Sequence, residues 1–174
     1  MDNGARRRHA VLVQPHLPAL PMHEVLRPST AADAAFIYDL CEVTMKRHAE
    51  AVGRKWSVTK MRDKCAHDAA DAGTRIIQLE GHDVGAFLFC RREHDFWLDG
   101  LYLLPQAQRL GIGSRLVESA KAEALGAGLG IELVVMKANP ARAFWERHGF
   151  VVTGDDELTF HMSLDPGRTG ASFG

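Results

Sequence analysis

The amino-acid sequence predicts an α/β fold, in which a mixed, mostly antiparallel sheet is covered by helices on both faces. Runs rich in branched and aromatic residues, which favour strands, alternate with segments whose apolar residues recur at helical spacing. A short polar turn at residues 80–83 separates two of the strand-like runs, which is typical of an antiparallel hairpin. The 174 residues are 46% hydrophobic and 25% charged, and this composition suits one globular domain with a substantial core.

In the first half of the chain, strands are expected on either side of a pair of helices. Thr30 and Asp33 have the spacing of a capping box, so a helix should begin there and, from its apolar periodicity, end near His48. A second helix is expected to begin at Ser57. The expected strands are residues 24–27, 74–79, 84–90 and 96–104.

In the second half, a helix is expected to begin near Ile112, because the apolar residues after it recur at helical spacing. Another helix should be capped by Asn139, start with Pro140 and end at Gly149. The expected strands are residues 131–135, 150–153 and 158–163.

The two ends of the chain differ from the rest in composition. Three consecutive arginines at residues 6–8 precede a short apolar run, and three prolines then interrupt any periodicity. The run is too short for a signal peptide, and no small-residue cleavage site follows it. We therefore expect residues 1–21 to form a loosely ordered extension, residues 22–165 to form the domain and residues 166–174 to form a polar tail.

Composition excludes several function classes. A net charge of −1 gives no electrostatic reason to expect nucleic acid or an anionic membrane as a partner. No apolar run approaches the ~18 residues that a membrane-spanning helix needs. Cys41, Cys65 and Cys90 are far apart, and no Cys-x-x-Cys or His-Glu-x-x-His pattern occurs. We therefore expect these three cysteines to be reduced packing residues of a cytoplasmic protein, and we expect no metal site.

The most informative segment follows the strand expected at residues 96–104. Gly111 and Gly113 lie where a polar loop enters a helix, and a glycine-rich helix N-terminus offers unpaired N–H groups and a positive dipole end to a phosphate. A plain turn is the alternative, because Gly-x-Gly is common at such junctions. A dinucleotide fingerprint is excluded, since its third glycine would fall at Leu116. A Walker A loop is excluded, since no Gly-Lys-Ser or Gly-Lys-Thr occurs.

Two ordered motifs resemble those of one family. Gln108, Gly111 and Gly113 form Gln-x-x-Gly-x-Gly directly after a strand, which resembles the signature of the GNAT family of acetyl-CoA-dependent N-acetyltransferases. Residues 139–150 resemble that family's Asn-x-x-Ala…Phe-Tyr-Glu-x-x-Gly-Phe segment, in the same order. The resemblance covers residues 22–164 and implies the GNAT fold, with acetyl-CoA as co-substrate and no metal.

The resemblance also implies which residues bind coenzyme A. Backbone N–H groups of residues 108–114 would hold the pyrophosphate, Leu103 and Leu104 would pair with the pantetheine arm, and Asn139 would lie beside that arm or the thioester. The implied coenzyme-binding residues are Leu103, Leu104, Gln108, Arg109, Leu110, Gly111, Ile112, Gly113, Ser114, Asn139 and Trp145.

The family's reaction needs a group that removes a proton from the attacking amine. Asp99 is the first candidate, because it interrupts an otherwise apolar strand where some family members carry an acidic residue. Glu93 and Asp95, in the preceding turn, are rivals. The alternative is that Asp99 only pairs with a neighbouring donor to support the structure.

Trp145 stands where many family members have a tyrosine that is thought to protonate the departing thiolate. Indole is no acid at neutral pH, although its N–H can donate a hydrogen bond. Three accounts are open: the thiolate leaves unassisted, Tyr102 or a histidine such as His148 or His161 substitutes, or the protein binds the coenzyme and turns over poorly.

The sequence therefore predicts an N-acetyltransferase, which transfers an acetyl group from acetyl-CoA to an amine acceptor by direct attack in a ternary complex. The acceptor would be a small amine, a lysine or an N-terminus. A catalytically weak acyl-CoA-binding or sensing module and an unrelated structural domain are the alternatives. Acidic residues at positions 39, 42, 93, 95 and 99 hint at a cationic amine. Family members are often dimers, which makes a homodimer an expectation. The resemblance implies that the first two helices lie over the acceptor pocket, so the candidate acceptor contacts are Asp39, Glu42, His48, Glu50 and Trp56. The alternative for most of them is a solvated helix face.

Overall fold

One sheet of seven strands organises the molecule, in the order β1-β2-β3-β4-β5-β7-β6. The strands are β1 (Glu24–Pro28), β2 (Thr74–Leu79), β3 (His82–Arg91), β4 (Asp95–Leu103), β5 (Gly130–Met136), β6 (Val151–Asp155) and β7 (Thr159–Leu164). All neighbouring pairs are antiparallel except β4 and β5, which confirms the predicted mixed, mostly antiparallel sheet. The computed structural model describes residues 24–166, so the predicted extension at residues 1–21 lies outside the described residues.

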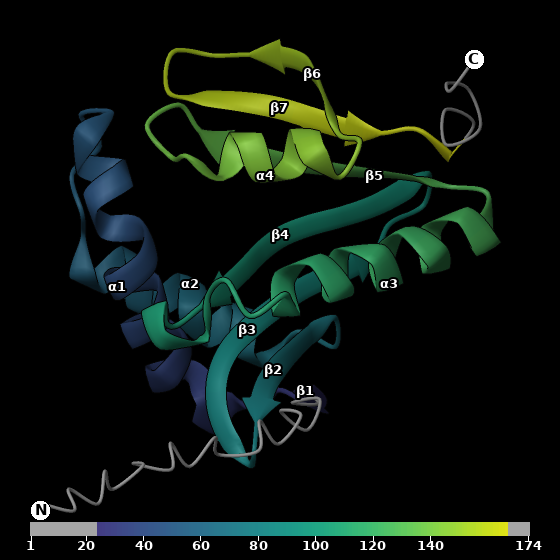
Figure 1. The fold of residues 1–174 in the computed structure, drawn as a ribbon. Helices are drawn as coiled ribbons and strands as arrows, with labels where there is room; N and C mark the ends of the chain where they lie inside the picture. The colour runs from purple at the N-terminus through teal and green to yellow at the C-terminus, as the bar shows by residue number, and fades with distance from the viewer. Residues whose placement is uncertain (1–23, 167–174) are drawn as a thin grey trace, which may run out of the picture.

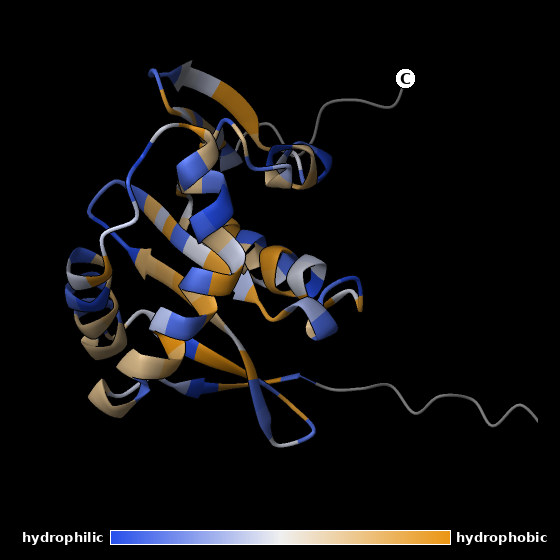
Figure 2. Ribbon diagram, turned by 90° about the vertical axis from the view of Figure 1, so that its left-hand side faces the viewer, coloured by the Kyte–Doolittle hydropathy of each residue, from blue (hydrophilic) through white to orange (hydrophobic). Residues whose placement is uncertain are grey.

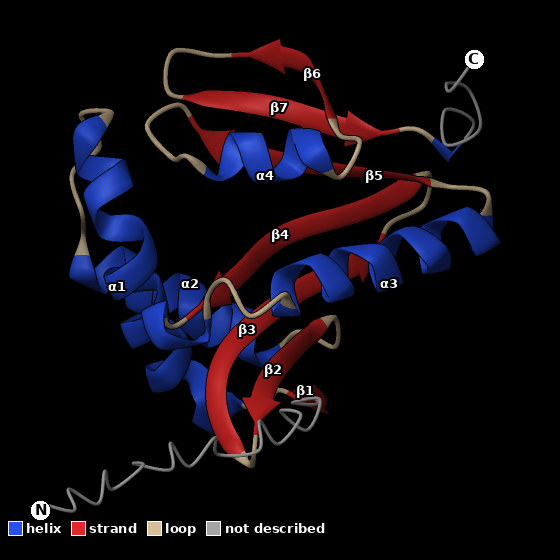
Figure 3. Cartoon of the chain, in the orientation of Figure 1, coloured by secondary structure: helices blue, strands red, loops and turns tan. Residues whose placement is uncertain are grey.

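Helices cover both faces of the sheet, as the sequence predicts (Figures 1 and 3). The helices are α1 (Ala34–Ala51), α2 (Val58–Ala70), α3 (Ile112–Ala127) and α4 (Ala141–Arg147), with two short 3-10 helices, η1 (Ala31–Asp33) and η2 (Pro105–Ala107). Helices α1 and α2 pack on one face, and α3 and α4 pack on the other.

The core is divided between these two faces. On one face, Val117 of α3 and Trp145 of α4 join strand residues such as Leu133. On the other face, Ile37 of α1 and Cys65 of α2 join residues of β2 and β3. Hydrophobic residues are concentrated along the strands between the helices, and hydrophilic residues are concentrated on the outer helix surfaces (Figure 2).

The hairpin between β2 and β3 is tighter than predicted. Its turn is Glu80-Gly81, with φ of 52° and 81°, and His82 already belongs to β3. Two left-handed residues match the twist of the flanking strands, so a two-residue turn replaces the predicted turn at residues 80–83.

Strands β4 and β5 run together over a short length and then separate (Figure 1). Only Asp95–Leu98 of β4 pairs with Gly130–Leu133 of β5. Directly afterwards β4 contains a β-bulge, because Leu88 and Phe89 of β3 lie opposite Gly100 and Leu98, which leaves Asp99 as the extra residue. Within the part of the chain that the structure describes, residues 100–103 pair with β3 on one side, and residues 99–103 have no strand on the other.

Candidate active site

The loop after β4 turns the chain onto the N-terminus of α3. Gln108 folds back, and its Nε2 donates to the backbone oxygen of Leu103 at 2.9 Å. Arg109 and Gly111 both have left-handed backbone, with φ of 62° and 80°. Leu110 between them is exposed. The predicted residues of this loop therefore lie beside the open edge of β4, at its carboxyl end.

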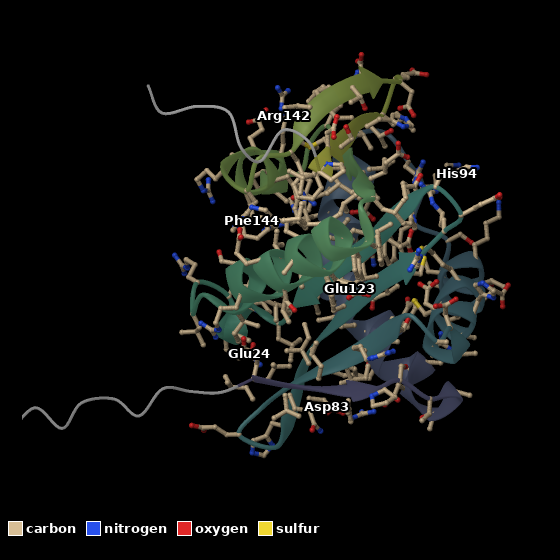
Figure 4. The ribbon with its side chains drawn as sticks, turned by 90° about the vertical axis from the view of Figure 1, so that its right-hand side faces the viewer. Glu24, Asp83, His94, Glu123, Arg142 and Phe144 are labelled. Carbon is tan, nitrogen blue, oxygen red and sulfur yellow. The ribbon has the colours of Figure 1, made fainter. Side chains whose placement is uncertain are left out.

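The N-terminus of α3 has the geometry of an anion site. The first backbone hydrogen bond of the helix runs from the Arg115 N–H to the Gly111 oxygen at 3.1 Å. The N–H groups of residues 112–114 therefore have no acceptor within the helix. Within residues 24–166, no side chain caps this end. Gly113 lies against the ring of Phe144, at 3.5 Å from the position a Cβ would take, and Figure 4 shows Phe144 between α4 and α3. The N–H groups that no side chain caps and the helix dipole together favour a phosphate here.

Ser114 belongs to a chain of three side chains that joins α3 to α4. Its Oγ lies 3.1 Å from Nε2 of His148, and Nδ1 of His148 lies 3.0 Å from Oε1 of Glu118. Hydrogen bonds from His148 and Lys121 hold the pKa of the Glu118 carboxyl below its usual range. Because the carboxylate only accepts, Nδ1 of His148 carries the proton that faces it. This chain fixes the Ser114 hydroxyl in the first turn of α3.

Asp99 occupies the bulge and is both paired and accessible. Its Oδ2 accepts from Lys64 Nζ at 2.7 Å, and its Oδ1 accepts from the indole Nε1 of Trp97 at 3.1 Å. One third of its side chain, 33%, is exposed. The structural pairing considered for Asp99 is therefore present, with Lys64 and Trp97 as the donors. A carboxylate with two donors and an open side can still accept a proton from a bound amine.

The side chain of Tyr102 lies beside the bulge, on the same face of β4 as Gly100. A Cβ built on Gly100 would be only 2.7 Å from the Tyr102 hydroxyl, so glycine is required there for the ring to take this position. Burial raises the pKa of Tyr102 well above its usual value. The hydroxyl therefore stays protonated at neutral pH and can donate a hydrogen bond near Asp99.

Trp145 and Asn139, the predicted coenzyme-binding residues after β5, lie in different surroundings. Trp145 is only 7% exposed, and its ring packs edge-on against Phe144 at 4.9 Å and Phe150 at 5.6 Å. Its indole is thus part of the core, and Phe144 rather than Trp145 borders Gly113. Asn139 is not the N-cap of α4 that the sequence predicted, although its Oδ1 accepts from the Ala141 N–H at 2.9 Å. The helix itself begins at Ala141, one residue later than predicted, because Pro140 is its N-cap.

A cavity of about 320 Å³ opens between α2 and the strands on the opposite face from α3. It reaches Asp99, and its α2 side is formed by residues that the sequence analysis did not single out. These are Lys64, His67, Asp68 and Asp71. Their spacing of three, four and seven residues is that of one helix face, so helical periodicity could have grouped them. Only the fold shows that this face meets Asp99.

The predicted acceptor contacts and the rival bases lie elsewhere. Glu42 accepts from the Tyr38 hydroxyl and from Lys46, both at 3.2 Å, and Asp95 pairs with Arg92 at 2.5 Å. Glu93 is almost fully exposed, at 87%. These side chains do not line the cavity at Asp99. Asp99 alone, of the five acidic positions named from the sequence, lines it.

The remaining candidates are a tryptophan and two histidines. Among residues 24–166, the indole N–H of Trp56 is buried without a hydrogen-bond partner. Burial lowers the pKa of His48, whose ring lies near the backbone of Ala138. His161 is half exposed and lies 3.6 Å from Asp156. None of these side chains lines the cavity at Asp99.

Residues 24–166 contain no group of three or more His, Cys, Asp or Glu side chains arranged to hold a metal ion. No helix among the same residues has the length and apolar character to cross a membrane.

Known proteins show the same fold. The PaiA N-acetyltransferase of Thermoplasma acidophilum, solved in complex with coenzyme A, superposes with a TM-score of 0.67 at 17% identity, covering 83% of this chain and 99% of that chain. An acetyltransferase from Thermus thermophilus gives 0.63 at 20% identity, over 83% and 97% of the two chains. Ard1 from Thermoplasma volcanium gives 0.61 at 15% identity, over 81% and 96%.

Sequence comparison adds a family match. No curated protein sequence matches the chain significantly. Residues 71–152, which include the bulge, the loop and α3, match the family model described as an acetyltransferase (GNAT) domain. This match and the shared fold confirm the predicted resemblance to the GNAT acetyltransferases.

Proposed function

We propose that the protein is an N-acetyltransferase that transfers the acetyl group of acetyl-CoA to an amine by direct attack in a ternary complex. One observation carries the proposal: β4 leaves β5 after Leu98, so the open edge of residues 99–103 runs from Asp99 to the uncapped N-terminus of α3. A phosphate-bearing arm can pair with this edge in the manner of an added strand. The neighbour from Thermoplasma acidophilum was crystallised with coenzyme A, which supports this choice of ligand.

In the proposal, the coenzyme supplies an activated acetyl thioester. Residues 108–114 would hold the pyrophosphate, chiefly through the N–H groups at the start of α3, and the Ser114 hydroxyl would be held in place by His148. Leu103 and Leu104 would present main-chain groups to the pantetheine arm. Asn139 would lie near the thioester end, since its Nδ2 reaches Met45 of α1 across the opening at 3.8 Å.

The proton balance assigns roles to Asp99 and Tyr102. Asp99 would take the proton of the attacking amine, a C–N bond would form at the acetyl carbon, and the C–S bond would break with the electron pair leaving on sulfur. A thiol has a pKa near ~8.5, and burial raises the pKa of Tyr102 well above its usual value. Proton transfer from Tyr102 to the thiolate is therefore uphill, so Tyr102 would act as a hydrogen-bond donor to the developing negative charge.

The second candidate is a catalytically weak acyl-CoA-binding or sensing module. Trp145 favours it, because a core indole replaces the tyrosine that many family members place there. We also propose a cytoplasmic location, since Cys41, Cys65 and Cys90 are free thiols. A homodimer remains a proposal from the family alone.

Calorimetric titration with acetyl-CoA tests the coenzyme site. We expect a micromolar dissociation constant, weakened at least ~10-fold by Gly113→Asp, because the added carboxylate meets the pyrophosphate at the helix N-terminus. A Cβ at Gly113 makes only ordinary contacts, so this variant should fold. Gly154→Asp is the matched control, because the same charge is added in open space on β6. If Gly113→Asp bound acetyl-CoA as tightly as Gly154→Asp, the proposed role of the loop in holding the pyrophosphate would be wrong.

Thiol release with a panel of amines separates the enzyme from the binding module. Coenzyme release that depends on an amine supports the transferase. Coenzyme binding without amine-dependent release supports the module. Failure to bind coenzyme overturns both.

A further inference from the structure

The cavity beside Asp99 has a strongly acidic lining. Asp68 of α2, Asp71 at the C-cap of α2 and Asp99 of β4 line it, together with Lys64. The three carboxylates and the one ammonium together carry a net charge of −2, not counting His67, which also lines the cavity. Burial raises the pKa of the Asp68 carboxyl, which means that its charge is costly without a cation beside it.

Lys64 shows what kind of group the cavity holds. Its ammonium lies 2.7 Å from Oδ2 of Asp68 and 2.7 Å from Oδ2 of Asp99, so one alkylammonium already bridges the two carboxylates. The Lys64 side chain is 44% exposed, whereas that of Asp68 is only 10% exposed. The lysine therefore enters from the solvent side, and a ligand can displace its flexible end without disturbing the core.

The size and walls of the cavity select among cations. Its volume of about 320 Å³ is at the lower end of the range for small-molecule sites. Leu88 and Trp97 provide apolar walls that suit a methylene chain. Among residues 24–166 no group of side chains is arranged to hold a metal ion, so an organic cation fits better than a metal.

We propose that this cavity binds the acceptor, and that the acceptor is a primary alkylamine carrying a second cationic group. The proposal rests on the transferase function proposed above and names its substrate class. The reacting amine would lie beside Asp99 at the bulge, where β4 parts from β5. The second cation would lie beside Asp68 and Asp71, in the place from which the Lys64 ammonium withdraws.

Direct binding measurements test this inference without turnover. The probes are 1,5-diaminopentane, pentylamine and 5-aminopentanoate, which share a primary amine and differ in the charge at the far end. We expect the diamine to bind wild-type protein at least ~10-fold more tightly than pentylamine, and 5-aminopentanoate to bind most weakly, in calorimetry or ligand-observed NMR at low salt.

Substitutions of the cavity aspartates test whether the preference for the diamine over pentylamine arises in the cavity. Asp68→Asn and Asp71→Asn should each reduce the preference for the diamine at least ~5-fold. Asparagine can still accept from Lys64 at position 68, and the exposed position 71 provides a second variant if Asp68→Asn fails to fold. Asp63→Asn is the matched control, because Asp63 is an exposed carboxylate on the same helix and does not line the cavity.

The outcomes separate this inference from the proposed function. Equal binding of diamine and pentylamine overturns the inference, and acetyl-CoA binding measured on the same protein then still supports the transferase. A diamine preference that Asp63→Asn reduces as much as Asp68→Asn also overturns it. Diamine binding without acetyl-CoA binding supports the cavity assignment and overturns the transferase.

Discussion

The role proposed for Asp99 depends on an irregularity in one strand. A β-bulge re-aims a side chain, and here it leaves Asp99 between the end of the β4–β5 pairing and the cavity under α2. Gly100, the next residue, leaves room for the Tyr102 hydroxyl, which a Cβ at position 100 would approach to 2.7 Å. Asp99, Gly100 and Tyr102 thus lie in one short stretch of β4 that includes the bulge.

At this scale we predict the effect of Asp99→Asn. Catalytic efficiency with amines should fall about 10²- to 10⁴-fold, the usual contribution of a general base, because an amide cannot take the proton. The dissociation constant for acetyl-CoA should stay unchanged, since Asp99 lies outside the proposed coenzyme loop of residues 108–114, and the single amide oxygen of the variant can still accept from either Lys64 or Trp97. Steady-state kinetics and calorimetry check both. Asp95→Asn is the control, and an equal loss of activity in that variant would contradict the role of Asp99.

At the scale of elements, one arginine ties three segments together. Arg27 of β1 pairs with Asp33 at the start of α1, at 2.7 Å, and with Asp83 of β3, at 2.6 Å. Asp33 also accepts from the Thr30 N–H at 2.8 Å, which is the bond expected of the predicted capping box. The hydrogen bond from Arg27 lowers the pKa of Asp33 from its ordinary 3.8 to about 2.

This lowered pKa predicts a pH-dependent stability. A carboxylate whose pKa is depressed by folding stabilises the fold fully above its unfolded pKa, and the contribution is lost as the pH falls through the folded value. We expect Asp33→Asn to lower the free energy of unfolding by about 1 to 2 kcal/mol at pH 6, and by almost nothing at pH 2. Urea denaturation at the two pH values checks this. A difference from wild type that does not shrink between pH 4 and pH 2 would refute the assignment.

At the scale of the whole molecule, the parting of β4 and β5 divides the sheet. Strands β1 to β4 lie on one side of the parting and β5 to β7 on the other, joined over four residue pairs. Helix α3 packs on both β4 and β5, and Asn139 touches Met45 of α1 across the same opening. A ligand along the open edge of β4 would therefore join two parts of the sheet that few main-chain bonds connect.

We predict that acetyl-CoA stabilises the fold against heat. At 100 times the dissociation constant, binding to the native state alone adds about 2.7 kcal/mol. For a domain of this size, that should raise Tm by roughly 5 to 10 °C. Differential scanning calorimetry checks the shift, which Gly113→Asp should reduce to about half or less and Gly154→Asp should keep. An unchanged Tm in wild-type protein at that concentration would mean that the open edge does not take the coenzyme.

Local signals were enough to predict much of this protein. Strand and helix positions follow from apolar periodicity, and the starts of α1 and α3 follow from Thr30, Asp33 and Gly111, because caps and glycine turns act over a few residues. The Gln-x-x-Gly-x-Gly loop and the segment at residues 139–150 were sufficient to indicate the family. The roles of the individual coenzyme residues stay predictions.

Other features depend on contacts between segments far apart in the chain. The motif position of Trp145 predicts a coenzyme contact, which stays a prediction, and only the fold shows that its ring packs in the core against Phe150 and Phe144. Lys64 and Asp68 gave no signal, because a charged helix face usually meets only water.

The sequence by itself determined the α/β class, the order of the elements and the family, since each depends on neighbouring residues. Only the tertiary structure decided that the face of α2 meets the bulge of β4. That juxtaposition joins residues 64 and 99 through an ion pair of 2.7 Å, and long-range pairing of this kind leaves no periodic trace in the chain.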